Sequence, residues 1–195
     1  MPKLERQREL RKLLEQNPFL SDVELATRFG VSVQTIRLDR VALGIGDVRQ
    51  RTRAIADRVR GVVKSLAPKE VVGDIIEIHL GDSGVSILET TQDMVFQRTR
   101  VVRGQYIFAQ ADSLAIALVD ADVVLTGLAN IKFKRPVKVG EKLVARAEVI
   151  KKKGNKWVIL VVTCSGADQV FRGKFVVFAL SQEEGGKEGR VQDSR

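Results

Sequence analysis

Two hydrophobic periods divide the chain into a helical part and a strand-rich part. In the first 66 residues, apolar side chains recur at steps of three and four, which predicts amphipathic helices at about 3–16, 22–30, 33–43 and 47–66. From residue 71 onward, β-branched runs separated by Gly, Asn and Asp predict strands at about 72–80, 85–91, 123–134, 142–152, 156–165 and 170–180. One apolar helix, at about 105–119, interrupts the strands. The pattern therefore predicts an α+β fold.

The second and third helices have the spacing of a helix-turn-helix. Ser21 and Glu24 form a capping box at the start of the second helix, Gly30 ends that helix, and Ser32 caps the third. Two short helices joined by a glycine-containing turn are typical of DNA-binding heads. We therefore predict an all-α DNA-binding domain over residues 1–45.

The third helix is the expected recognition helix. In this type of docking, its N-terminal residues meet base edges, and flanking polar and basic groups hold phosphates. We expect Gln34 and Thr35 to contact bases. Ser32, Arg37 and Arg40 are candidates for phosphate or base contacts. The alternative for each arginine is a place on a solvated helix face.

An amphipathic connector, residues 46–67, joins the two parts. Its apolar stripe has steps of seven, four, three and four residues, which match a heptad seam; the stripe consists of Val48, Ile55, Val59, Val62 and Leu66. The simplest interpretation is an ordinary amphipathic helix packed on its own domain. The functional interpretation is a lever that docks on the downstream domain or on a second copy, and so transmits a ligand signal.

The strands behind the connector can curl around the apolar helix. One long helix followed by antiparallel strands describes a hot-dog fold, which we assign to residues 68–181; the polar tail, 182–195, is expected to be disordered. A single sheet of this kind leaves an edge exposed, so a homodimer is expected. Arg103 and Gly104 open the helix, where the helix dipole and a guanidinium together favour an anion. This helix start is the predicted ligand site.

Charge and composition narrow the function further. Of the net charge of +9, the first 66 residues carry most, with 14 Lys and Arg against 8 Asp and Glu, which favours nucleic-acid binding at the front. The single Cys164 excludes an intramolecular disulfide, and with His79 as the only histidine no metal site is expected. Because no apolar run approaches the roughly 20 residues that span a bilayer, we expect a cytoplasmic protein without a membrane partner.

Two stretches resemble known families. Residues 29–40 resemble the recognition helix of DeoR-type regulators. Residues 103–112 resemble the His-Gly-Gly…Phe…Ala-Asp motif of hot-dog acyl-CoA thioesterases, with Arg103 in place of histidine and Gln105 in place of the second glycine. Together, over residues 4–180, the chain is similar to the FapR family of bacterial repressors of fatty acid and phospholipid synthesis.

The resemblance implies a homodimeric repressor that binds double-stranded operator DNA and leaves it when malonyl-CoA, or malonyl-acyl-carrier protein, enters the hot-dog domain. It implies that Arg103 reads the malonyl carboxylate, since the arginine fork fits a carboxylate with two hydrogen bonds. It also implies that Gly104 lets the thioester approach, and that Phe96 and Leu125 line the tunnel. No catalytic residue and no cofactor are expected, so the chain is predicted not to be an enzyme.

Asp112, which we include among the effector-binding candidates, departs from the family pattern, which has an amide there. Active thioesterases often have a carboxylate at this position. Either Asp112 is protonated or paired to Arg103 and the domain only binds, or some hydrolysis survives. The alternative function is therefore an acyl-CoA thioesterase with an appended DNA-binding head. A third possibility is a scaffold that dimerises the heads without binding any CoA ester.

Overall fold

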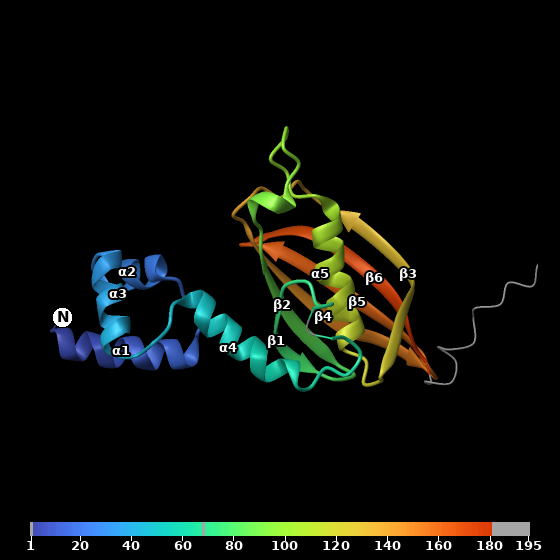
Figure 1. Ribbon diagram of the computed structural model, residues 1–195, viewed down its shortest axis with the longest axis horizontal. Helices are drawn as coiled ribbons and strands as arrows, with labels where there is room; N and C mark the ends of the chain where they lie inside the picture. Colours follow the sequence, from blue (N-terminus) through green and yellow to red (C-terminus); the bar gives the residue numbers. More distant parts are fainter. Residues whose placement is uncertain (1, 68, 181–195) are drawn as a thin grey trace, which may run out of the picture. The chain divides into compact units, whose positions relative to one another are not determined.

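The computed structural model describes residues 2–67 and 69–180, drawn in colour in Figure 1. The predicted disordered tail, 182–195, lies outside the described residues. By the density of contacts, the chain divides into two compact units, Met1–Asp57 and Arg58–Arg195. None of the helices in the described part is long and apolar enough to cross a membrane.

The first unit is the predicted helical head. Its helices are α1 (Lys3–Gln16), α2 (Asp22–Phe29) and α3 (Val33–Ala42), which bury one cluster made of Leu10, Leu14, Leu25, Ala26 and Ile36. The capping box of Ser21 and Glu24 is present, and Gly30 ends α2 with φ of +63°, a conformation that favours glycine. The local signals of a helix-turn-helix are thus confirmed.

The connector helix, α4 (Val48–Arg60), is shorter than predicted. The expected helix ran to residue 66, but Gly61 and the β-branched Val62 and Val63 follow Arg60, and these residues favour helix less than their neighbours do. The backbone therefore leaves the helix, and the heptad stripe ends with it. Val59, Val63 and Leu66 pack against the core of the second unit, whereas Val62 is exposed.

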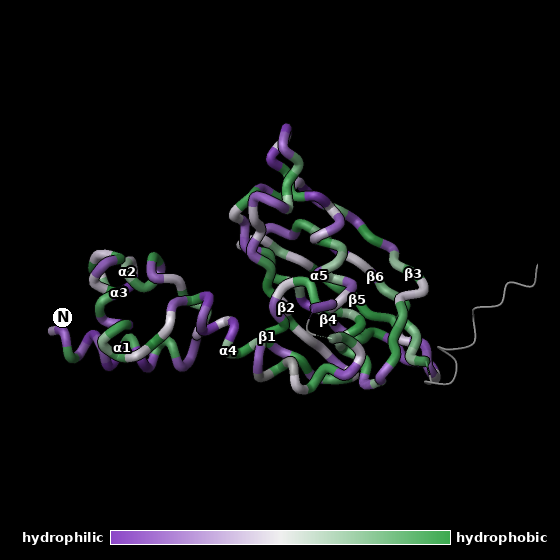
Figure 2. Tube along the Cα trace, in the orientation of Figure 1, coloured by the Kyte–Doolittle hydropathy of each residue, from purple (hydrophilic) through white to green (hydrophobic). Residues whose placement is uncertain are grey.

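The second unit is an antiparallel sheet with a helix along one face (Figure 1). Its described strands are β1 (Asp74–His79), β2 (Ser83–Glu89), β3 (Val123–Phe133), β4 (Lys142–Lys153), β5 (Lys156–Ser165) and β6 (Asp168–Leu180), in the order β1-β2-β4-β5-β6-β3. The six predicted strands are all present. Figure 2 shows both hydrophobic and hydrophilic stretches along the chain of this unit. Along β5, buried positions alternate with partly exposed ones, as a sheet with one covered face requires.

The covering helix, α5 (Gly104–Ala117), is packed almost all round. Ala111, Leu114 and Ala115 are fully buried, and so is Leu118 just beyond the helix. On the sheet, Gly84 faces the helix so closely that an added Cβ would lie 3.2 Å from Leu118 and 3.3 Å from Leu114. The prediction of an α+β chain with a hot-dog domain is confirmed.

A charged cluster fastens the loop between β3 and β4 to the end of β5. Arg135 donates to Glu141 at 2.8 Å, the Ser165 hydroxyl donates at 2.6 Å, and the backbone N–H of Lys138 donates at 2.6 Å. The hydrogen bond from Arg135, together with the other two donors, lowers the pKa of the Glu141 carboxyl to about 2, although partial burial opposes the shift. The folded protein therefore favours the charged carboxylate form of Glu141.

We predict that this cluster makes stability fall in acid. A carboxyl with a lowered folded-state pKa stabilises the fold above its unfolded pKa, and that contribution is lost as pH falls from about 4.5 towards 2. Discounted for the partial exposure of both side chains, the loss should be about 1–2 kcal/mol. Thermal unfolding followed across this window should show a smaller pH dependence in Glu141→Gln than in the wild type. If the stability of the two proteins depended equally on pH, Glu141 would not be the group that causes the loss in acid.

Candidate DNA-binding and effector sites

The start of α3 presents most of the predicted DNA-binding residues at the surface. The Ser32 hydroxyl accepts from the backbone N–H of Thr35 at 3.1 Å, and the two hydroxyls lie 2.9 Å apart. Gln34 is exposed, and the Arg37 guanidinium is largely exposed, lying 3.6 Å from Asp22. These four side chains remain predictions for DNA contacts, with Ser32 also serving as the helix cap.

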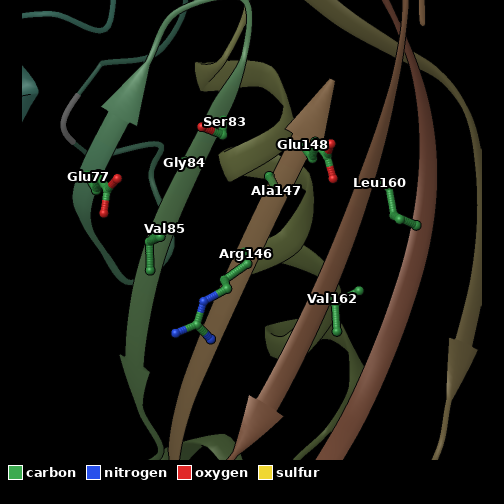
Figure 3. Close-up of a pocket in the computed structure, with 9 residues that line it drawn as sticks. All are labelled: Glu77, Ser83, Gly84, Val85, Arg146, Ala147, Glu148, Leu160 and Val162. Carbon is green, nitrogen blue, oxygen red and sulfur yellow. The ribbon is translucent and has the colours of Figure 1, made fainter. Parts of the chain in front are cut away.

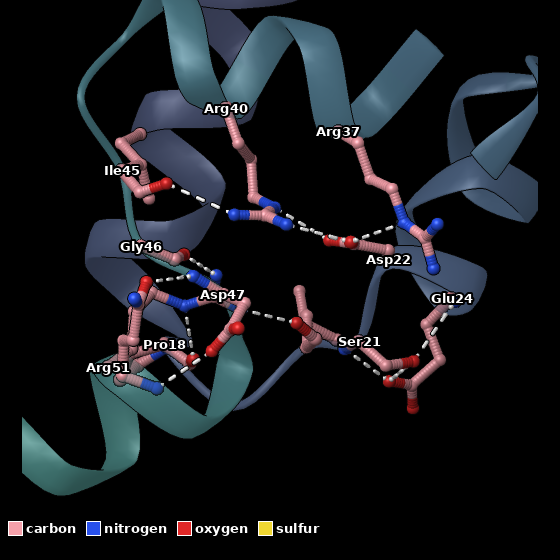
Figure 4. Close-up of polar contacts among 12 residues, drawn as sticks. Pro18, Ser21, Asp22, Glu24, Arg37, Arg40, Ile45, Gly46, Asp47 and Arg51 are labelled. Atoms are coloured by element: carbon pink, nitrogen blue, oxygen red, sulfur yellow. Dashed lines mark hydrogen bonds and ion pairs between the residues drawn. The ribbon is translucent and has the colours of Figure 1, made fainter. Parts of the chain in front are cut away.

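Arg40 does not have the role predicted for it. Its side chain is only 8% exposed, and the guanidinium donates to both carboxylate oxygens of Asp22, at 2.7 and 2.8 Å, and to the Ile45 carbonyl at 3.1 Å (Figure 4). A guanidinium held in this way has no free fork for a phosphate. The sequence carried a signal for this, because Arg40 lies four residues after the core residue Ile36 and so shares its face.

Two other polar groups of the head have structural roles that the sequence pattern did not reveal. Asp39 is buried on α3 and accepts from Arg6 at 2.6 Å and from Gln7 at 2.8 Å, both on α1. The Arg51 guanidinium of α4 donates to the carbonyls of Pro18, Leu20 and Gly46 (Figure 4). These contacts fix α3, and the start of α4, within the head.

In the second unit, Arg103 lies at the N-terminal end of α5, as predicted. Its guanidinium donates to the Tyr106 hydroxyl at 2.8 Å, to the Asp93 carbonyl, and more weakly to the Met94 carbonyl at 3.4 Å. The guanidinium also lies over the Tyr106 ring, 5.0 Å from its centroid. Among the described residues, no carboxylate lies within 4.0 Å of this cation. The pKa of the Asp93 carboxyl is lowered mainly by a hydrogen bond from Thr91, and the charge of Arg103 adds to this effect.

Gly104 lies close to an aromatic ring in this structure. An added Cβ would lie 3.0 Å from the Phe133 ring, which packs edge-on against Phe171 with 5.2 Å between ring centroids. The space beside Gly104, where the family resemblance places the thioester, is thus bordered by an aromatic side chain from β3. Phe133 itself is partly exposed.

Phe96 lies in the loop that leads into α5. A short 3-10 helix, Gln92–Met94, precedes the loop, and Val95 pairs with Val102 at its base. The loop borders an open hollow of about 540 Å³, lined by Phe96, Gln97, Arg98, Thr99 and Val101. Phe96, Arg103 and Gly104 therefore belong to one end of the domain.

Asp112 and Leu125 form a separate group. The Thr126 hydroxyl donates to Asp112 at 2.6 Å, and burial raises the pKa of the Asp112 carboxyl above its ordinary value, against the lowering effect of that bond. Asp112 lies eight residues beyond Gly104, about 12 Å along the helix, and it is not paired with Arg103. Leu125, next to Thr126, is exposed on the edge strand β3.

Another hollow, of about 370 Å³, lies on the face of the sheet that points away from α5 (Figure 3). Val85, Arg146 and Val162 project into it from β2, β4 and β5. Because Gly84 faces α5, its neighbour Val85 must point to the opposite face. None of the predicted effector-binding residues lines this hollow.

Comparison with known families agrees with both units. Residues 6–61 match the DeoR-like helix-turn-helix domain, and residues 101–170 match the thioesterase superfamily. Among solved structures, an uncharacterised protein from Pyrococcus horikoshii is similar, with 33% identity and a TM-score of 0.57 over 61% of this chain and 92% of that one. A sigma28-regulated virulence protein from Campylobacter jejuni is similar at 25% identity, with a TM-score of 0.61 over 66% of this chain and 92% of that one.

Similarity over the whole chain decides between regulator and enzyme. The transcription factor FapR of Caldanaerobacter subterraneus is 53% identical over 181 residues, 93% of this chain and 90% of that protein. The transcription factor FapR of Bacillus subtilis is 44% identical over 179 residues, 90% of this chain and 95% of that protein. Both carry the name of a transcription factor, which confirms a DNA-binding regulator and not an enzyme. The chain, with its helix-turn-helix head and hot-dog domain, belongs to the FapR family of transcription factors.

Proposed function

We propose that this chain is a homodimeric repressor of fatty acid and phospholipid biosynthesis genes, which leaves its operator when the hot-dog domain binds malonyl-CoA or malonyl-acyl-carrier protein. The observation that carries the proposal is the Arg103 guanidinium, which donates only to neutral groups and has no carboxylate within 4.0 Å among the described residues, although its charge helps to lower the pKa of Asp93. Malonyl-CoA acts here as an effector ligand, and the proposed mechanism requires no cofactor.

Arg103 supplies the selectivity in this proposal. Malonyl-CoA differs from acetyl-CoA by one carboxylate, and a guanidinium can bind a carboxylate through a charge-assisted hydrogen bond. Two carbonyls and the Tyr106 hydroxyl accept from Nε and Nη2 of this side chain and leave Nη1 to donate to the ligand, so little rotamer entropy remains to be lost on binding. A ligand without the carboxylate would cover the cation without neutralising it, which is unfavourable.

The sheet supports the dimer. β3 and β1 are its two edges, and β3, with 11 residues, is much longer than β1, with 6. β3 exposes Leu125, Leu128 and Phe133, a combination that favours pairing with another strand. A twofold pairing of β3 with β3 of a second copy would satisfy both edges with the same surface. This pairing would also cover Asp112, because Thr126, which donates to Asp112, lies on β3.

The segment after α4, residues 61–66, contacts α5 and could transmit a ligand signal. The Ser65 hydroxyl donates to the Ile116 carbonyl of α5 at 3.1 Å, and Leu66 packs on the same core. A ligand at the start of α5 that shifts this helix would therefore bias residues 61–66 and, through α4, the head. The shift in population can be no larger than the difference in ligand affinity between the two states.

The test is release of DNA by ligand. A labelled operator, selected from random DNA by the full-length protein, is followed by fluorescence anisotropy while malonyl-CoA, acetyl-CoA and free CoA are titrated separately. We expect malonyl-CoA alone to release the DNA. An equal response to all three ligands, or a response to none, would contradict malonyl-CoA as the effector without contradicting DNA binding.

A further inference from the structure

The recognition helix exposes two large aliphatic side chains. Leu38 is 62% exposed and Val41 is 74% exposed, although both lie on a helix whose other apolar residue in the middle, Ile36, is fully buried. A single exposed aliphatic residue is ordinary on a protein surface. Two on one face of a DNA-reading helix form an exposed apolar surface.

The two side chains share a face with Gln34. Residues on a helix are about 100° apart, so positions 34, 38 and 41 fall within about 60° of one another, opposite Ile36. Asp39 and Arg40 lie on the buried side, where they are paired to Arg6 and Asp22. These ion pairs fix the rotation of α3 about its axis. Gln34, Leu38 and Val41 are therefore held on its outward face, and we call them the outward stripe.

Gln34 and the two aliphatic residues suit the same kind of base pair. In the major groove, a glutamine can bind adenine through N6 and N7, and the C5-methyl of thymine is the one apolar group that natural base pairs present there. Leucine and valine offer no hydrogen bond, so opposite a guanine, cytosine or adenine edge they would desolvate polar atoms without compensation. Opposite a thymine methyl they gain buried apolar area.

We propose that Leu38 and Val41 determine operator specificity by packing against thymine C5-methyl groups, so that the outward stripe selects A·T pairs. The proposal rests on DNA binding by the head, the function shared by the family. It adds two specificity residues to the polar candidates, and it explains why these positions of α3 are aliphatic. The competing explanation is that a second copy of the head covers the same stripe.

The experiment removes the methyl groups one at a time. Operator DNA selected from random sequence by the full-length protein is synthesised with single thymines replaced by deoxyuridine, which keeps the base pair and lacks only the C5-methyl. At one or two positions in each half-site, we expect wild-type affinity to fall about fourfold, the worth of one buried methyl group. In Leu38→Ala or Val41→Ala, the effect at the corresponding position should disappear.

Leu4→Ala is the matched control. Leu4 is 76% exposed on α1, so this substitution removes a similar aliphatic surface outside the recognition helix. It should leave the deoxyuridine profile of the wild type unchanged.

Three results would overturn the proposal. Equal wild-type affinity for thymine and deoxyuridine at every position would do so, with DNA binding itself still established. An unchanged profile in both alanine variants, accompanied by weaker self-association, would assign the stripe to a second copy. Failure of the wild type to select any DNA would overturn the DNA-binding function as well, which makes the two failures distinguishable.

Discussion

Arg103→Gln should bind malonyl-CoA about 10- to 100-fold more weakly than the wild type, the loss expected when a charge-assisted hydrogen bond is removed. The operator should then stay bound at ligand concentrations that release the wild type. Glutamine keeps one amide donor but lacks the charge and the fork. Calorimetric titration with malonyl-CoA measures the affinity, and anisotropy on operator DNA measures the release.

Two further variants separate the charge of Arg103 from its geometry. Arg103→Lys keeps a cation without the planar fork, so its affinity should fall between those of the wild type and Arg103→Gln. Arg172→Gln removes an exposed arginine on β6, outside the start of α5, and should behave as the wild type. If Arg103→Gln still released DNA with malonyl-CoA but not with acetyl-CoA, another cation would have to read the carboxylate.

For Asp112, the sequence left two roles open: a residue of a domain that only binds its ligand, or a residue that supports some hydrolysis. Its partner is the Thr126 hydroxyl, and its raised pKa favours the protonated form more than an ordinary aspartate would. A protonated carboxyl would repel a malonyl group less than a carboxylate would. The distance along α5 from Gly104 further separates it from the proposed carboxylate reader. Binding without hydrolysis is therefore compatible with an acid at this position.

Local signals made most of the fold predictable. The capping box of Ser21 and Glu24 and the positive φ of Gly30 depend on residues within a few positions, so the sequence displays them directly. The strands were equally visible because β-branched runs bounded by turn residues are also local features of the sequence. These elements, taken in order, were sufficient for a helix-turn-helix followed by a hot-dog domain.

Contacts between distant residues were not predictable in the same way. Arg40 reaches Asp22 and Asp39 reaches Arg6, 18 and 33 residues away along the chain, and no local pattern marks those partners. Gly104 was interpreted as space for a ligand, whereas Phe133 from β3 fills part of that space. The end of α4 was missed because the stripe of valines continued in sequence after the backbone had left the helix.

The second large effect is expected in the head, from Asp22→Ala. This substitution leaves the Arg40 guanidinium, whose side chain is 8% exposed, without its carboxylate. The hydrogen bond from Arg40 lowers the pKa of the Asp22 carboxyl, which shows that the folded head favours the charged pair. Removing one member of a buried pair costs more than the pair contributes, because the other charge stays desolvated. We expect the head to lose about 2–3 kcal/mol, somewhat less than for a fully buried pair.

Hydrogen exchange on the full chain can measure this loss, because amides of α2 and α3 report the head while amides of α5 and β5 serve as an internal reference. Arg37→Ala is the matched control: it removes only the exposed contact at 3.6 Å to the same carboxylate, and should cost less than about 0.5 kcal/mol. The double variant Asp22→Leu/Arg40→Met, which removes both charges, should recover most of the loss. If Asp22→Ala exchanged like the wild type, the orientation of α3 would have to be held by the Asp39 contacts alone, and the outward stripe would lose one of its two anchors.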